Sequence, residues 1–338
     1  MRLLKLIAPA ALAVGLASTS FAQTATPEAQ SAAATASPAK RSVIPSAAAT
    51  YATFQGDIGE IGAKPLSSQA EIEQKLDALG GHNPGKLTNG WMSYSALVAA
   101  QNREFAASVR DIDSYYGRER LLAALEKNPA YVTQLDGGDK ALQSALAAAK
   151  ADSRRMASAA AFMESQESSL QNKSWVKERI RDGKDRADKL LSMSYSGRPV
   201  SASARELFAG DGVGAMLENA GSPGATSVWD RASILVSNAP GSALTSFTGP
   251  KYQVNPSRTE TANHMASLAA YEIVGQADAS QKGVQNAMND RKAEDCFDFA
   301  QLQLRGCVAG QSDHYGLQAC LRQHAISDVG ACVGEVAR

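Results

Sequence analysis

The stretch 138–197 constrains the fold more than any other part of the chain. From Leu142 onward, core-type residues follow one another at steps of four and three. This is the heptad spacing of a helix that lays one narrow stripe against a neighbouring helix. Two members of the stripe are polar, which argues against a coiled coil that is stable by itself and favours one arm of a helical bundle. The residues of this seam are Leu142, Leu146, Ala149, Ser153, Met156, Ala160, Met163, Glu167 and Leu170.

The seam loses its phase after Leu170. The next apolar residues at helical spacing start six positions later, at Val176, and Ser174 is placed to cap a new helix. The sequence therefore predicts two antiparallel helices, about 139–171 and 175–195, rather than one continuous rod.

The composition agrees with an all-α fold. Only 6% of the residues are aromatic, and alanine is abundant. Alanine is the best helix former, and its small side chain lets helices approach closely. We expect a helical bundle that contains the long antiparallel helical hairpin and a C-terminal helical hairpin pinned by disulfides.

Residues 1–22 have the pattern of a secretory signal peptide. Arg2 and Lys5 form the basic start, an apolar run follows, and a small-x-small cleavage site ends at Ala22. A retained membrane anchor is the alternative, but the apolar run is shorter than the ~20 residues that span a bilayer. We expect an exported protein, periplasmic or secreted after cleavage near Ala22, with no transmembrane segment in the mature chain.

The remainder divides into four segments of different texture. Residues 23–50 are mostly alanine, serine, threonine and proline, with almost no large apolar side chain. Such a segment cannot bury enough apolar surface to offset ordering, so a disordered tether is predicted. Residues 51–198 form the predicted bundle with its long hairpin. Glycines and prolines in 199–257 predict short helices and loops, and 258–338 is a predicted helical region that holds every cysteine.

Three predictions concern the first half of the bundle. The segment 51–66 is expected to be an irregular lead-in, because its apolar residues are scattered among glycines. A helix is expected over 68–79, ended by two glycines. Apolar residues recur at helical spacing from Trp91 to Tyr116, which predicts one central helix that ends at Gly117.

The charge balance argues against nucleic acid as a partner. The formal net charge is zero, and removal of residues 1–22 takes away two of the 34 basic residues and no acidic one, which leaves 32 basic and 34 acidic residues. The segment 173–189 holds seven basic and four acidic residues. A solvated helix face with internal ion pairs is the simpler interpretation. A docking surface for an acidic partner is the more specific alternative.

Motifs for catalysis or cofactor binding are weak. The glycines of 210–214 resemble half of a nucleotide-binding turn, but no predicted strand precedes them. Ser174 and Lys177 have the Ser-x-x-Lys spacing without its companion motifs. Glu164 and Glu167 can mimic the single acid of a helical muramidase, although a solvated helix face explains them equally well. We therefore predict no catalytic residue and no cofactor.

The cysteines are the one specific group of residues. All four lie in the last 43 residues, at positions that suit a disulfide framework in an exported chain. Metal binding by two of them with two histidines is the alternative, but the spacing matches no standard zinc pattern. The residues concerned are Cys296, Cys307, Cys320 and Cys332, with His314 and His324.

Helical geometry predicts the pairing. Cys296 and Cys307 are about 16 Å apart along one helix and about 20° apart around it, so they face the same neighbour but cannot bond each other. A reversal after Cys307 then places Cys320 opposite Cys307, and Cys332 opposite Cys296. Twelve residues leave Cys332 about 120° off the face of Cys320 in a regular helix. We therefore expect the chain to bend or to end its helix at 328–330.

Taken together, these features predict a non-catalytic scaffold, adaptor or assembly factor of the bacterial periplasm or cell envelope. Long helical seams without catalytic motifs would hold a protein partner in the envelope. The alternative is a cell-wall-acting enzyme, a muramidase-type hydrolase that uses Glu164 or Glu167.

Overall fold

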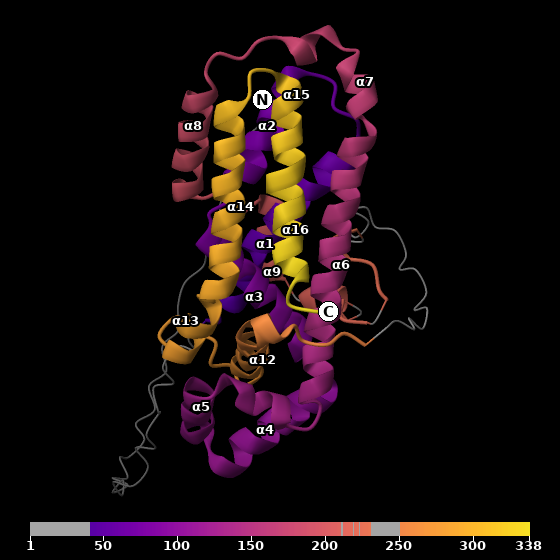
Figure 1. The fold of residues 1–338 in the computed structure, drawn as a ribbon. Coiled ribbons are helices and arrows are strands. Elements are labelled where there is room, and N and C mark those ends of the chain that lie inside the picture. Colours follow the sequence, from indigo (N-terminus) through magenta and orange to yellow (C-terminus); the bar gives the residue numbers. More distant parts are fainter. Residues whose placement is uncertain (1–40, 211, 219, 223, 231–250) are drawn as a thin grey trace, which may run out of the picture. The chain divides into compact units, whose positions relative to one another are not determined.

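The computed structural model describes residues 41–210, 212–218, 220–222, 224–230 and 251–338. Within these residues every regular element is a helix, and the β-contacts are two isolated bridges, which confirms the all-α prediction (Figure 1). The first half contains α1 (Ile44–Ala63), α2 (Gln69–Gly80), α3 (Pro84–Ala100), α4 (Arg103–Tyr116), α5 (Arg118–Lys127), η1 (Pro129–Gln134), α6 (Gly138–Ser165) and α7 (Glu167–Gln171). The second half contains η2 (Ser174–Lys177), α8 (Gly183–Ser196), α9 (Ala202–Ala209), α10 (Gly212–Leu217), η3 (Pro256–Arg258), α12 (Thr259–Ile273), α13 (Lys282–Met288), α14 (Arg291–Gly310), α15 (His314–Cys320), η4 (Leu321–Asp328) and α16 (Val329–Gly334).

Helix α3 lies at the centre of the core. It packs on α1, α6, α12 and α14, and its Trp91 and Tyr94 side chains are buried. Gly90 lets α1 approach closely, because a Cβ at this position would stand 2.8 Å from the backbone nitrogen of Tyr51. The start of the helix predicted to be central therefore does lie at the centre of the core, as α3.

That helix is shorter than predicted. The single helix expected from Trp91 to Tyr116 is divided into α3 and α4, since the chain turns at 101–102. The Asn102 side chain accepts a hydrogen bond of 2.9 Å from the backbone N–H of Phe105, which caps α4. Val98 and Phe105 are one heptad apart, so the apolar spacing continues across the break and conceals it.

Helix α1 is the main error of the sequence predictions in this half. Residues 44–50 were expected in the tether and 51–66 in an irregular lead-in, yet 44–63 form one helix. Ala48, Ala49 and Ala52 are buried rather than solvated, and Pro45 stands in the first turn, where a missing N–H costs nothing. The predicted signal peptide and residues 23–40 of the predicted tether lie outside the described residues.

The long hairpin runs antiparallel as predicted, but its arms are spread apart. Figure 1 shows α6 and α8 on either side of the C-terminal helices, and α8 packs mainly on α14 and α2. The second arm also begins later than predicted, at Gly183 rather than at 175. The connecting chain pairs instead with the turn after α14, through a hydrogen bond of 2.8 Å from Ile180 N–H to the Ser312 carbonyl. This hydrogen bond holds Ile180 beside the turn rather than in a helix. Ser174 therefore starts only the short helix η2 and caps no long helix.

The later half of the predicted seam on α6, from Ser153 onward, packs on η4 and α16 of the C-terminal hairpin. Leu146, Met156 and Met163 are fully buried along the seam. Its polar Ser153 contacts Gly334 of α16, so the partner of this half of the seam is the C-terminal hairpin rather than α8.

Two disulfides pin that C-terminal hairpin. They join Cys296 to Cys332 and Cys307 to Cys320, with Cα atoms 5.8 Å and 5.7 Å apart, which confirms the predicted pairing. Such bonds are consistent with an oxidising compartment. The predicted bend at 328–330 is wrong, because the helix continues through α16.

The π-helical stretch η4 replaces the bend. Its hydrogen bonds run from residue i to i+5, so each residue turns through less than the 100° of an α-helix. A deficit of about 15° per residue over this stretch removes the whole 120° offset of Cys332.

The segment 199–257 contains short helices, as expected, in its described parts, and 231–250 of the predicted loop lies outside them. No helix in the described ranges combines the length and the apolar character needed to cross a bilayer.

Candidate functional site

The residues with weak catalytic signals lie on the surface of the protein. Glu164 is exposed on α6, and Glu167 forms an ion pair of 3.2 Å with Arg322. Ser174 and Lys177 are both exposed in η2. The glycine-rich stretch 212–217 forms α10, while Asp211 lies outside the described residues.

The two thiols that the metal alternative required are used by the disulfide between Cys307 and Cys320. His314 instead lies 3.2 Å from a carboxylate oxygen of Glu73, and His324 lies 2.7 Å from one of Asp328. Within the described part of the chain, no group of three or more histidine, cysteine or acidic side chains is placed to hold a metal ion.

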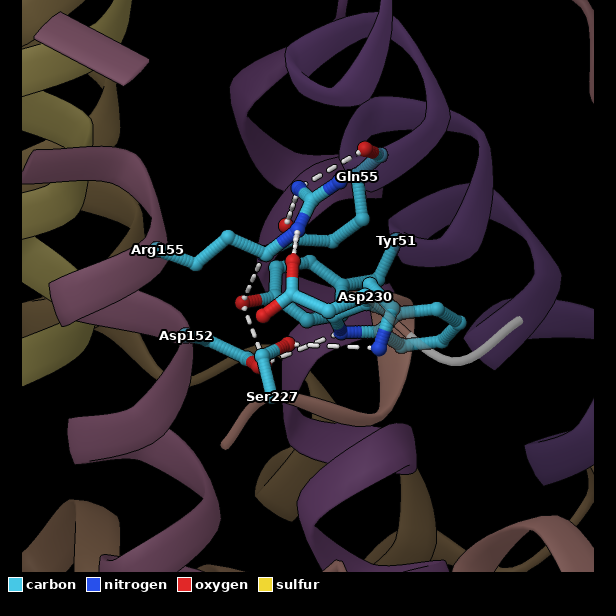
Figure 2. A network of polar contacts seen from close by, with 7 residues as sticks. Tyr51, Gln55, Asp152, Arg155, Ser227 and Asp230 are labelled. Atoms are coloured by element: carbon cyan, nitrogen blue, oxygen red, sulfur yellow. Dashed lines mark hydrogen bonds and ion pairs between the residues drawn. The ribbon is translucent and has the colours of Figure 1, made fainter. Parts of the chain in front are cut away.

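A buried polar network joins α1, α6 and the segment 227–230 (Figure 2). The Asp152 carboxylate lies at its centre and is fully buried. It accepts hydrogen bonds of 3.0 Å from the Tyr51 hydroxyl, 2.6 Å from the Ser227 hydroxyl and 3.1 Å from the Trp229 indole N–H.

Arg155 extends the network toward the surface. Its Nε pairs with Asp230 at 2.8 Å, and its Nη1 donates to the carbonyl and the side-chain oxygen of Gln55. The Gln55 amide in turn donates 2.7 Å to the Tyr51 hydroxyl, so Tyr51 links the arginine to Asp152. The network therefore fixes 227–230 against two helices at once.

Burial raises the pKa of Asp152 to about 6, although its three hydrogen-bond donors and Arg155 act to lower it. Burial also raises the pKa of Tyr51 well above its ordinary value. The Asp152 and Ser227 side chains are both inaccessible to solvent, so this arrangement suits a structural clamp rather than chemistry on a substrate. Sequence reasoning missed it, because Asp152 has the appearance of a solvated residue beside the seam.

A different feature meets the requirements of an interaction site. Four of the six exposed large hydrophobic side chains in the described ranges lie on two adjacent helices, α8 and α14. They are Leu191 (36% exposed), Tyr195 (77%), Phe299 (60%) and Leu302 (54%). We call this set the outer α8–α14 face.

Close contacts set the register of the two helices. Gly183 lies against the carbonyl of Ala309, and Leu190 and Leu304 both lie against Gly80. The helices are therefore antiparallel, which places Leu191 about level with Leu302 and Tyr195 about level with Phe299.

Side-chain directions put all four on one side of the pair. On α8, Arg186 and Lys189 reach Glu73 and Asp77 of α2, and Leu191 and Tyr195 lie on the opposite flank. On α14 the cysteines face the neighbouring helix and the buried residues face the core, so Phe299 and Leu302 point outward.

The charges around this face are mixed in sign at both ends. Lys184 and Arg305 lie toward the end where Gly183 meets Ala309, together with the exposed Asp185 and Asp188. The exposed Asp295 and Asp298 lie toward the other end, together with the exposed Arg291. An apolar centre surrounded by a charged rim is typical of protein interaction surfaces.

Comparison with protein-family models, with curated proteins and with solved structures finds no match to this chain.

Proposed function

We propose that this chain is an exported, non-catalytic scaffold or adaptor of the bacterial envelope that holds a partner protein on the outer α8–α14 face. The observation that carries the proposal is the gathering of Leu191, Tyr195, Phe299 and Leu302 on one side of two packed helices. Contiguous exposed apolar surface on a folded domain is typical of interaction sites.

The charge pattern indicates which partner surface fits. A helix with an apolar stripe would cover the four side chains. Beside that stripe, charges of both signs on the partner would meet the mixed charges at the two ends of the face.

The rigidity of the support suits a scaffold. Two disulfides hold α14 to the C-terminal helices, and ion pairs hold α8 to α2. A preordered surface loses little conformational entropy on binding.

The test compares capture of envelope proteins by the full chain and by two double variants. Phe299→Ser with Leu302→Ser removes the apolar centre, and Tyr115→Ser with Tyr116→Ser removes the other exposed aromatic pair as a matched control. We expect one protein to be retained equally by wild type and control and to fall at least tenfold with the first variant, at equal melting temperatures. Equal capture by all three proteins would overturn the proposed face.

Two further measurements address the competing functions. Light scattering on wild type and on the Phe299/Leu302 variant would show whether a second copy occupies the face, since only wild type would then be a dimer. Incubation with peptidoglycan tests the enzyme alternative. Release of muropeptides that stops on Glu164→Gln or Glu167→Gln would overturn the non-catalytic function.

A further inference from the structure

A surface pocket beside α2 has a charge arrangement that the proposed scaffold does not use. It lies between the end of α1, the outer side of α2 and Arg198, with a volume of about 460 Å³. This is within the usual range for small-molecule sites. Its lining residues are Asp57, Glu60, Ala70, Glu73, Gln74, Lys75, Asp77, Ala78 and Arg198.

Three of the four acids in the pocket already have cationic partners. Asp57 forms a two-point pair with Arg198, at 2.7 Å for each contact, and its Oδ2 lies 2.8 Å from the buried His82. Glu73 pairs with Arg186, and Asp77 pairs with Lys189. These carboxylates are held in place and are largely neutralised.

Lys75 is different, because its side chain is buried but has no anionic partner. Only 7% of it is exposed, and its ammonium donates a 3.0 Å hydrogen bond to the backbone carbonyl of Glu60. That carbonyl belongs to the last turn of α1, where carbonyls lack helical partners. Among the described residues, no carboxylate lies within ion-pair distance of this ammonium, which keeps further N–H donors in the pocket lining.

Glu60 supplies the opposite charge. Its side chain is exposed at the pocket, and within the described ranges no hydrogen bond or ion pair uses its carboxylate. The pocket therefore contains one cation and one anion that remain unmatched, while Gln74 adds an exposed amide and Ala70 and Ala78 leave room.

We propose that this pocket binds a small zwitterion, an amino acid or a short peptide, with its carboxylate on the Lys75 ammonium and its ammonium on the Glu60 carboxylate. A buried ammonium without an anion is costly, and a ligand carboxylate relieves that cost. A purely anionic ligand would meet Glu60 and the neighbouring acids, and a purely cationic ligand would leave Lys75 unmatched. The inference is independent of the outer α8–α14 face.

Calorimetric titration of the full chain with glycylglycine tests the proposal, with two blocked analogues as probes. N-acetylglycylglycine lacks the ammonium, and glycylglycinamide lacks the carboxylate. We expect binding of glycylglycine and at least tenfold weaker binding of both analogues. No heat from glycylglycine at millimolar concentration, or equal binding of either analogue, would overturn the proposal.

Variants assign the binding to the pocket. Lys75→Met keeps the length of the side chain without its charge, and Glu60→Gln changes an exposed residue that cannot affect the core. Each is expected to weaken glycylglycine binding at least tenfold. Asp77→Asn, on the same pocket but paired with Lys189, is the control that retains binding. Undiminished binding by Glu60→Gln, or loss of binding by the control alone, would contradict the assignment.

Discussion

The Ser153 side chain on α6 occupies the space that a Cβ at Gly334 of α16 would need. One turn earlier, a Cβ at Gly330 would stand 3.1 Å from Cβ of Met156. The two helices therefore approach closely because one offers glycines and the other a small residue at the contact. Ser153 interrupts the apolar seam for reasons of size rather than of polarity.

Gly334→Ala should destabilise the protein by about 1–3 kcal/mol, because an overpacked contact forces the helices apart. Ser153→Gly in the same chain should restore part of the loss. Urea unfolding of the two single variants and the double variant measures the coupling between these positions. Gly306→Ala is the control. Its added methyl meets no neighbour, and alanine is the better helix former, so it should stabilise by about 0.5–1 kcal/mol.

Leu146→Asp or Met156→Asp should unfold the bundle. Both side chains are fully buried, and an unpaired carboxylate in the core costs several kcal/mol. Lys184→Ala, at an exposed position of α8, should change the free energy of unfolding by less than about 0.5 kcal/mol. Thermal melts decide the matter, and a wild-type melting temperature for Met156→Asp would contradict the packing of the seam.

The seam and the disulfides were predictable because helical geometry fixes them locally. Residues that are 11 positions apart lie on the same face of a helix, so the positions of the cysteines indicate which of them can form disulfides with each other. Helix α1 was not predictable in the same way. Its alanine-rich start resembles a tether in composition, yet Ala48, Ala49 and Ala52 are core residues, because α1 packs on α3 with Gly90 at the close contact. The Pro45 start signal was present but weak.

Ionisation of Asp152 should lower the free energy of unfolding as pH rises. A carboxylate in an ion pair has the opposite effect, because its pKa is lowered in the folded state. The folded chain keeps this proton up to about pH 6, whereas the unfolded chain loses it near the ordinary value of 3.8. Between these values the folded state binds more protons, so the free energy of unfolding falls as pH rises. At about 1.4 kcal/mol per pKa unit, the total loss attributable to this group is about 3 kcal/mol.

Asp152→Asn isolates that contribution, because other carboxyl groups titrate in both proteins. The stability of wild type relative to the variant should decrease from pH 4 to pH 7 and be constant outside this range. Urea unfolding at several pH values measures the difference. A difference that is independent of pH would show that Asp152 does not titrate in this window.

The network around Asp152 was beyond sequence reasoning for a physical reason. Tyr51, Asp152 and Ser227 are separated by 101 and 75 residues, and only the packing of α1 on α6 brings them together. The one available signal in the sequence is the spacing of Ser227 and Asp230, which has the form of a helix-capping box, and the Ser227 hydroxyl accepts a hydrogen bond from Trp229 N–H.

The two disulfides should differ in their contributions. Cys296 and Cys332 are 36 residues apart, and Cys307 and Cys320 only 13. In the chain-entropy model the longer loop gives about 4 kcal/mol and the shorter about 3 kcal/mol. Replacing each pair with serines, followed by urea unfolding, should show the larger loss for the outer pair. A larger loss for the inner pair would indicate that local helix packing outweighs chain entropy.

Deletion of Gln323 should be tolerated, although it lies inside a helix. The residue is exposed within η4, and loss of one residue lets the stretch close into a regular α-helix. Peptide mapping should still find both disulfides, with a stability loss of about 1 kcal/mol or less. Deletion of the equally exposed Ala157 is the contrast, because it rotates Met163 by about 100° off the packed face of α6 and should unfold the protein.

Cys320 and Cys332 are twelve positions apart, whereas Cys296 and Cys307 on the opposite helix are eleven positions apart. The C-terminal helix therefore contains one additional residue between its two cysteines. The π-helical stretch accommodates the additional residue, so α16 keeps the same face toward α6. In evolutionary terms, η4 is a place where this helix can gain or lose a residue without changing its partners. A homologous chain in which the two cysteines of each helix are eleven positions apart is therefore expected to keep the same disulfides, with a regular α-helix in place of η4.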